Sequence, residues 1–141
     1  EREMPDGEYD LVTASYFQSP VALARADILR RAMAKLVPGG YFLCIAHASA
    51  PPWRKGNGEH QFPTLQEELD GLDLGSDEWI LHKAGYAVRN VTGPEGEKAE
   101  VKDIVLLLQR GCFLTTWKVR GQLNPSCSFI RGTFRVRVAR R

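Results

Sequence analysis

The feature that most constrains the fold is an unbroken apolar run, Tyr41-Phe42-Leu43-Cys44-Ile45-Ala46. A strand with one wet face alternates apolar and polar residues, whereas a run that is apolar at every position suits a strand covered on both faces. Such strands are typical of the parallel sheets of α/β proteins. The run therefore predicts a buried parallel strand, and it follows the turn-like sequence Val37-Pro38-Gly39-Gly40.

A second strand and a helix are expected before that run. Residues 9–16 are short, mostly apolar and rich in β-forming types, which favours a buried strand. Residues 21–36 are rich in Ala, Leu and Arg, which favour a helix, and Ser19-Pro20 suits its beginning. We expect Pro38 to end this helix, because proline cannot continue one. Residues 9–46 then form one βαβ unit.

The sequence after this unit predicts a hairpin. Residues 64–69 favour a short helix, and residues 78–91 favour a strand with an irregularity near Ala84-Gly85; a helix over the first part of that segment is the alternative. Residues 92–98 form a turn cluster before the strand-like segment 101–109. Strands joined by so short a connection pair antiparallel.

Charge divides the chain sharply. The net charge is only +2, but all 17 acidic residues lie in residues 1–110, and residues 111–141 contain only basic charges. This predicts one domain over 1–110, followed by a basic tail over 111–141. A length of 141 residues allows one domain and hardly two.

The tail has three interpretations. Its basic residues suit contact with phosphates, and Trp117, Phe129 and Phe134 could stack on bases. Alternatively, the alternation over 134–138 belongs to an added strand pair that packs on the sheet. The third interpretation is that the sequence of the tail is unrelated to the packing of the domain.

Composition excludes several classes of protein. No apolar stretch has the length of a membrane helix, and residues 1–6 lack the apolar core of a secretory signal. The cysteines Cys44, Cys112 and Cys127 form no C-x-x-C pair, and the three histidines are well separated, so neither a disulfide framework nor a metal site is expected. A reducing, cytoplasmic setting follows.

The order of these motifs resembles a known family. Asp10-Leu11-Val12, a helix, the turn Leu36-Val37-Pro38-Gly39-Gly40 and a strand look like the region after strand 4 of class I S-adenosylmethionine (SAM)-dependent methyltransferases. The later segments are similar to the end of tellurite-resistance-type methyltransferases: Glu67-Glu68-Leu69, Trp79-Ile80-Leu81-His82-Lys83, residues 91–98 and residues 104–110. The resemblance covers about residues 6–110.

The resemblance implies a partial Rossmann-like α/β sheet, with strands 4 to 7 and an antiparallel C-terminal hairpin. We expect only the C-terminal half of the domain here, because no Gly-rich loop follows a strand in this sequence. Most of the SAM site would then lie in a preceding half outside this chain.

Ligands of open α/β sheets lie beyond the carboxyl ends of the parallel strands. At the end of the first strand, the resemblance implies contact with the methionine part of SAM by Thr13, Ala14, Ser15 and Tyr16. Ordinary strand-end packing is the alternative for Ser15 and Tyr16.

At the end of the second strand, the resemblance places His47 and Trp53 toward the methyl acceptor. Histidine accepts protons near neutral pH, and tryptophan stacks on apolar groups. The alternatives are a rim histidine and a loop anchor. No catalytic residue is assigned, because methyl transfer from a sulfonium depends mainly on alignment of donor and acceptor.

The leading hypothesis is a partial methyltransferase acting on a small-molecule acceptor, with the activity of this chain alone left open. The second is a non-catalytic module that self-associates through strand 9–16, because an uncovered apolar strand edge recruits other strands. The third is a basic-tailed nucleic-acid binder, although nucleic acid is the less expected partner, and no membrane contact is expected.

Overall fold

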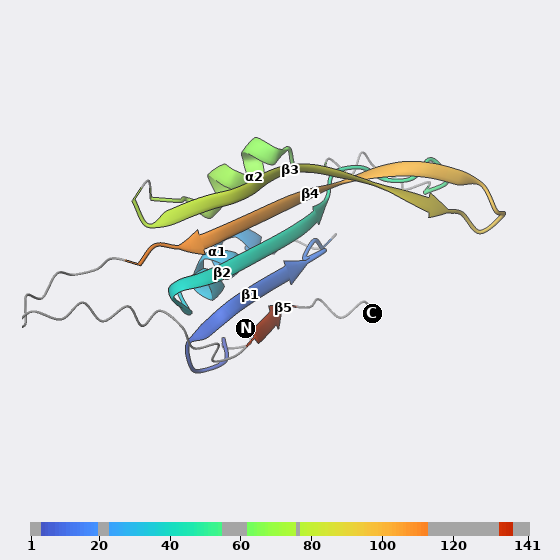
Figure 1. Cartoon of the computed structure of the whole chain (residues 1–141). Helices are drawn as coiled ribbons and strands as arrows, with labels where there is room; N and C mark the ends of the chain where they lie inside the picture. The colour runs from blue at the N-terminus through green and yellow to red at the C-terminus, as the bar shows by residue number, and fades with distance from the viewer. Residues whose placement is uncertain (1–3, 20–22, 55–61, 76, 113–132, 137–141) are drawn as a thin grey trace, which may run out of the picture.

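The fold is described by a computed structural model that covers residues 4–19, 23–54, 62–75, 77–112 and the backbone of 133–136. These residues form one mixed sheet with two helices (Figure 1). In chain order the elements are β1 (Tyr9–Ser15), α1 (Arg25–Met33), β2 (Leu36–His47), α2 (Leu65–Leu72), β3 (Trp79–Thr92), β4 (Lys98–Arg110) and β5 (Thr133–Val136). Their order across the sheet is β3-β4-β2-β1-β5.

The predicted βαβ unit is confirmed. β1 and β2 are parallel neighbours, in register from Leu11 opposite Tyr41 to Ser15 opposite Ile45. Helix α1 connects them, but it begins at Arg25, and its N-cap Ala24 makes no side-chain cap bond. The expected start at Ser19-Pro20 is therefore wrong for Ser19, which lies before the helix, and Pro20 lies outside the described residues.

The Pro-Gly-Gly segment lies inside β2, where the sequence predicts a turn that ends the helix. Gly39 has φ of +83°, which explains a glycine there. A Cβ on Gly40 would lie 3.1 Å from the carbonyl oxygen of Asp10. The register of β1 against β2 shifts between Tyr9 and Leu11, beside this segment. The two glycines thus let the backbones of β1 and β2 approach closely.

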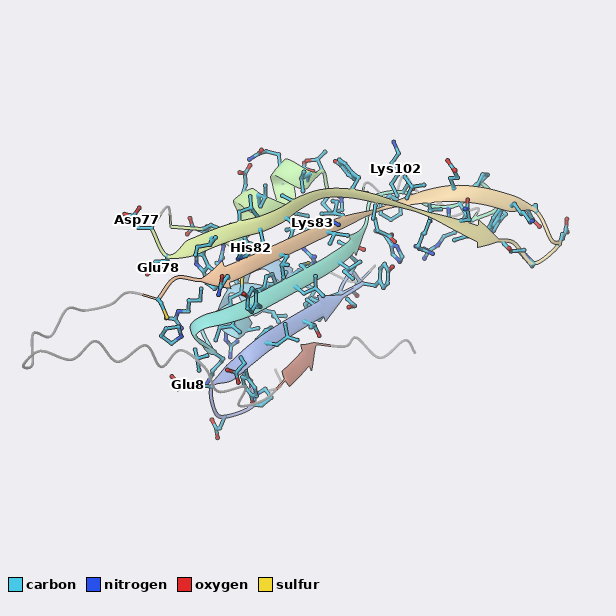
Figure 2. All side chains as sticks on the ribbon, viewed as in Figure 1. Glu8, Asp77, Glu78, His82, Lys83 and Lys102 are labelled. Carbon is cyan, nitrogen blue, oxygen red and sulfur yellow. The ribbon has the colours of Figure 1, made fainter. Side chains whose placement is uncertain are left out.

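The predicted hairpin is also confirmed. β3 and β4 pair antiparallel from Trp79 opposite Arg110 to Thr92 opposite Lys98. The irregularity lies between Leu81 and Lys83 rather than at Ala84-Gly85, and the alternative of a helix is wrong. Figure 2 shows His82 and Lys83 on this outer strand.

The hairpin extends beyond the rest of the sheet (Figure 1). Pairing of β2 with β4 ends at His47 opposite Asp103, whereas β3 and β4 remain paired as far as Thr92 and Lys98. Among the described residues, no third strand continues beside β3 and β4 past Asp103, so the two strands form a two-stranded ribbon there.

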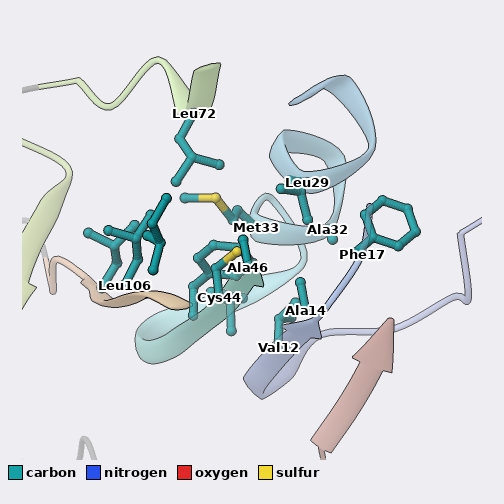
Figure 3. Packing of buried hydrophobic residues seen from close by; sticks show 14 residues of the cluster. Val12, Ala14, Phe17, Leu29, Ala32, Met33, Cys44, Ala46, Leu72 and Leu106 are labelled. Atoms are coloured by element: carbon teal, nitrogen blue, oxygen red, sulfur yellow. The ribbon is translucent and has the colours of Figure 1, made fainter. Parts of the chain in front are cut away.

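Both helices pack on one face of the sheet, which we call the helix face (Figure 3). Alternate residues of the strands point to this face, because side chains alternate along a strand. The resulting core consists of Val12, Ala14, Phe17, Leu29, Ala32, Met33, Leu36, Phe42, Cys44, Ala46, Leu72, Ile104, Leu106 and Leu108.

The opposite face, which we call the second face, carries the remaining half of the apolar run. Leu43 and Ile45 are partly buried there, opposite Leu107 and Val105 of β4. Among the described elements, both helices lie on the helix face. The sequence predicts that the run Tyr41–Ala46 is covered on both faces. Within the described residues, helices cover it on one face.

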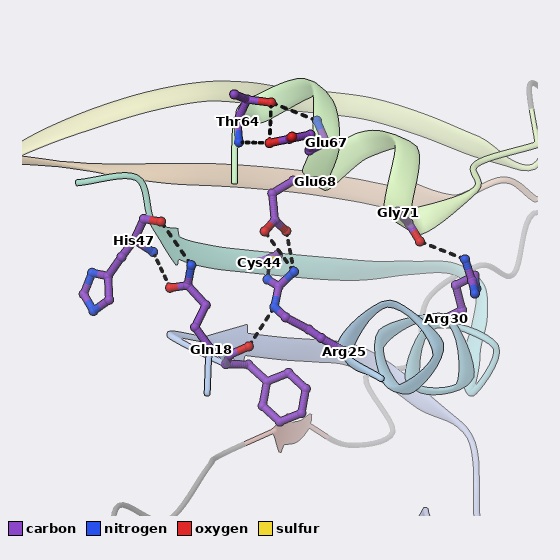
Figure 4. Close-up of polar contacts among 10 residues, drawn as sticks. Gln18, Arg25, Arg30, Cys44, His47, Thr64, Glu67, Glu68 and Gly71 are labelled. Carbon is purple, nitrogen blue, oxygen red and sulfur yellow. Dashed lines mark hydrogen bonds and ion pairs between the residues drawn. The ribbon is translucent and has the colours of Figure 1, made fainter. Parts of the chain in front are cut away.

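A buried ion pair ties the two helices together (Figure 4). Arg25 of α1 donates to both carboxylate oxygens of Glu68 on α2, at 2.9 and 2.7 Å, and to the carbonyl oxygen of Phe17 at 2.7 Å. Helix α2 begins with a complete capping box between Thr64 and Glu67. Because these charges and donors are partnered, burial of Glu68 is tolerated.

Part of the basic tail joins the sheet. β5 pairs parallel with β1 from Leu11 opposite Thr133 to Ala14 opposite Val136. The edge of β1, expected to be open, is therefore paired at these four positions, and self-association through it stays a prediction. Residues 113–132 and 137–141 lie outside the described residues. The boundary at Arg110-Gly111 also remains a prediction.

No helix in the described part of the chain is both long and apolar enough to span a bilayer.

Neighbouring residues of β2 give a test of the two faces. Phe42 is fully buried on the helix face, and Tyr41 is 39% exposed. We expect Phe42→Ala to lower the free energy of unfolding by about 3–5 kcal/mol, because it leaves a cavity. Tyr41→Ala, the matched control, should cost about 1 kcal/mol or less. Urea unfolding measures both, and equal losses would contradict this assignment of the faces.

Candidate functional site

The carboxyl ends of β1 and β2 lie next to each other because the strands are parallel. Tyr16 follows β1 in a left-handed conformation (φ +53°), and its backbone N–H donates to Ile45 at 2.7 Å. Its ring stacks on that of His47, the last residue of β2, with centroids 4.3 Å apart. The parallel register thus brings together two aromatic side chains that lie 31 positions apart in the sequence.

Asp103 of β4 is the centre of a polar cluster at this edge. It pairs across from His47 and is 3% exposed. Its Oδ2 accepts from the Tyr16 hydroxyl at 3.0 Å and from Arg89 Nε at 2.6 Å. Its Oδ1 lies 3.1 Å from His47 Nδ1. We call Tyr16, His47, Arg89 and Asp103 the Asp103 cluster.

These contacts determine the charges in the cluster. Burial disfavours the charged form of Asp103, but hydrogen bonds from Arg89, His47 and Tyr16 outweigh it and lower the pKa of Asp103 below its usual value. Burial, together with the bond to Asp103, raises the pKa of Tyr16. At neutral pH, Asp103 is therefore a carboxylate, and Tyr16 is a protonated donor.

The carboxylate also determines the proton position on His47. Asp103 can only accept, so Nδ1 of His47 carries the proton, and Nε2 is left with a lone pair when the ring is neutral. Arg89 Nη2 also lies 3.5 Å from Nδ1, but two donors cannot bond each other. We therefore assign the Nδ1–H group as a donor to the Asp103 carboxylate. Among the described residues, none makes a hydrogen bond to Nε2.

The backbone of His47 is held as well (Figure 4). Its N–H donates to Gln18 Oε1 at 2.8 Å, and its carbonyl accepts from Gln18 Nε2 at 3.1 Å. Phe62 meets the ring edge-on, with centroids 6.5 Å apart. The imidazole is therefore held by Tyr16, Asp103 and Phe62 while Gln18 holds its backbone, and its side chain remains 21% exposed.

Two of the six residues predicted from the sequence meet in this cluster, Tyr16 and His47. Ser15 and Thr13 are half-buried, one and three positions before Tyr16, on the second face of the sheet. Ala14 is fully buried in the core on the helix face. Trp53 is half-buried and makes none of the cluster's contacts. Contact of these residues with a ligand stays a prediction.

Sequence reasoning missed Asp103, Arg89 and Gln18. Asp103 carried one signal, because a carboxylate beside the apolar segment Ile104–Leu108 is unusual unless it is paired. Arg89 carried none, since it reaches Asp103 only through the register of β3 on β4. No group of three or more His, Cys, Asp or Glu suited to a metal ion occurs among the described residues.

The lowered pKa of Asp103 predicts a pH-dependent stability. Asp103→Asn should cost roughly 1–3 kcal/mol at pH 7, because buried donors lose a charged acceptor. A carboxylate with a lowered pKa stabilises the fold above its unfolded value of about 3.9, and the benefit disappears as pH falls through the folded pKa. The gap between wild type and variant should therefore shrink below about pH 4. Urea unfolding from pH 7 to 3 measures it.

The control is Asp73→Asn, which removes an exposed carboxylate at a left-handed position that asparagine also adopts. This variant should change the stability by about 0.5 kcal/mol or less. A gap for Asp103→Asn that stays constant from pH 7 to 3 would contradict the charge assignment.

Cys44 gives a separate test. Burial raises the pKa of its thiol to about 11, and only the thiolate reacts with alkylating agents. In the native chain, iodoacetamide should modify exposed Cys112 at least about 100-fold faster than Cys44. In urea the two should react alike, and peptide mass spectrometry measures both rates. Equal rates in the native chain would contradict the burial of Cys44.

Comparison with known proteins was made at the level of sequence and of fold. No protein-family model matches the chain, and no curated protein matches its sequence. Solved structures do match its fold. TehB from Haemophilus influenzae aligns over 77% of this chain with a TM-score of 0.53 and 16% identity. A structure titled "Conversion of a Disulfide Bond into a Thioacetal Group during Echinomycin Biosynthesis" aligns over 75% with a TM-score of 0.52 and 13% identity.

The chain spans 37% of the length of TehB and 50% of the length of the second solved chain. The alignments therefore concern part of a larger fold. Together with the parallel pair β1–β2 and the antiparallel hairpin β3–β4, they show that the chain has a partial, Rossmann-like α/β fold.

Proposed function

We propose that the chain supplies the acceptor side of a SAM-dependent methyltransferase site that acts on a small molecule. The observation that carries the proposal is the Asp103 cluster, which lies where β1 and β2 end in a fold of this type. In open α/β sheets this is the edge at which ligands bind. When bound, SAM supplies an electrophilic methyl group on a sulfonium.

The residues at this edge fit such a cofactor in part. Tyr16 is 38% exposed, and its π electrons suit a cation: the Arg89 guanidinium lies 5.7 Å from the ring centroid, where a bound sulfonium would have to compete with it. Asp103 supplies a negative charge at the hydroxyl end of that ring, although Arg89 partly balances it. Ser15 and Thr13 offer hydroxyl groups on the second face of the same strand.

The chain spans half or less of the length of the solved chains that it matches. That this chain by itself transfers a methyl group is therefore proposed here as well. We also propose the cytoplasm as its location, because the buried thiol of Cys44 is compatible with a reducing compartment.

Isothermal titration of the full chain with SAM tests this proposal. We expect saturable binding that Tyr16→Ala weakens by a factor of about 2 to 12, because one aromatic contact contributes about 0.5–1.5 kcal/mol. Tyr41→Ala is the matched control, since it removes an exposed tyrosine of β2 that lies outside the cluster. Absence of binding at millimolar SAM, or equal affinity in the two variants, would contradict the proposal.

A further inference from the structure

The Asp103 cluster holds an imidazole in one tautomer, with a second nitrogen to which no described residue makes a hydrogen bond. Nδ1 of His47 faces the Asp103 carboxylate at 3.1 Å, while Tyr16 stacks on the ring and Gln18 holds the backbone. This is the arrangement of a histidine general base that activates a nucleophile: a carboxylate orients the ring and stabilises the imidazolium that forms.

We propose that His47 is the general base of the site, that Asp103 is its positioning residue, and that the acceptor bears a proton on the oxygen or sulfur atom that is methylated. This inference rests on the proposed function. It narrows the acceptor to a neutral hydroxyl or thiol, because an acceptor that is already anionic needs no base.

The reaction balances without another reactant. The O–H or S–H bond of the acceptor breaks, and its proton moves to His47 Nε2. The electron pair left on the acceptor forms the new bond to the methyl carbon. The electrons of the broken carbon–sulfur bond remain on the cofactor sulfur, which becomes a neutral thioether. Imidazolium formed on His47 is then paired with Asp103 and releases its proton to water.

The rest of the cluster suits this role. Asp103 is buried but accepts from three groups, so its carboxylate stays charged beside the ring. The Arg89 side chain is 42% exposed and bonds the other carboxylate oxygen, which leaves Oδ1 to His47. Protonation of His47 at Nε2 therefore adds a positive charge next to the Asp103 carboxylate. The hydrogen bond from Nδ1–H to Asp103 is already in place, so the side chains need not rearrange.

Paired acceptors test the role of the base. In each pair one acceptor is largely protonated at pH 8.5 and the other largely ionised: 2-mercaptoethanol with 4-nitrothiophenol, and phenol with 4-nitrophenol. We expect His47→Gln to lower kcat/KM about 100-fold or more for the protonated member of at least one pair, and less than about threefold for the ionised member. The reacting pair identifies the acceptor atom as sulfur or oxygen.

His82→Gln is the matched control, because His82 lies on β3 and contacts Gln109 and Tyr41, away from the cluster. It should leave all four rates unchanged. Asp103→Asn should selectively lower kcat/KM for the same protonated acceptor. The double variant should be no slower than His47→Gln alone, because the two residues act as one unit.

The outcomes separate the two proposals. If the wild-type chain does not bind SAM by titration, the proposed function fails. If it binds SAM but methylates no acceptor, or if His47→Gln lowers the rates of protonated and ionised acceptors equally, the proposed function stands and the general base is overturned. Thermal unfolding of each variant confirms that the loss of rate is not a loss of fold.

Discussion

The parallel pairing of β1 with β2 is the constraint on which the candidate site depends. It places the ends of the two strands at one edge, so that Tyr16 and His47 stack although a helix separates them in sequence. The antiparallel entry of β4 beside β2 then brings Asp103 opposite His47. A shift of one residue in the pairing of β4 with β2 would turn Asp103 to the helix face, because neighbouring side chains alternate.

The sequence was sufficient to predict elements whose pattern is local. The apolar run over Tyr41–Ala46 identified a parallel strand, and the turn cluster near Gly93-Pro94 identified the hairpin. Pro38-Gly39-Gly40 misled the prediction, because the same residues that stop a helix also permit close approach of two strands.

The site was predictable only where it follows from strand ends. His47 and Tyr16 could be found because each directly terminates or follows an apolar run. Asp103 and Arg89 could not, because they come from the middle of β4 and β3 and reach the site through register alone. A single sequence specifies which residues form strands better than it specifies which residues face each other across them.

Arg89 lies at the base of the ribbon that β3 and β4 form beyond the end of β2. Two strands without a third neighbour twist and bend more readily than a wider sheet. The guanidinium that balances Asp103 is therefore mounted where the three-stranded part of the sheet passes into the two-stranded ribbon. A bend of the ribbon at this junction would change the distance between Arg89 and Asp103, and with it the charge that faces His47.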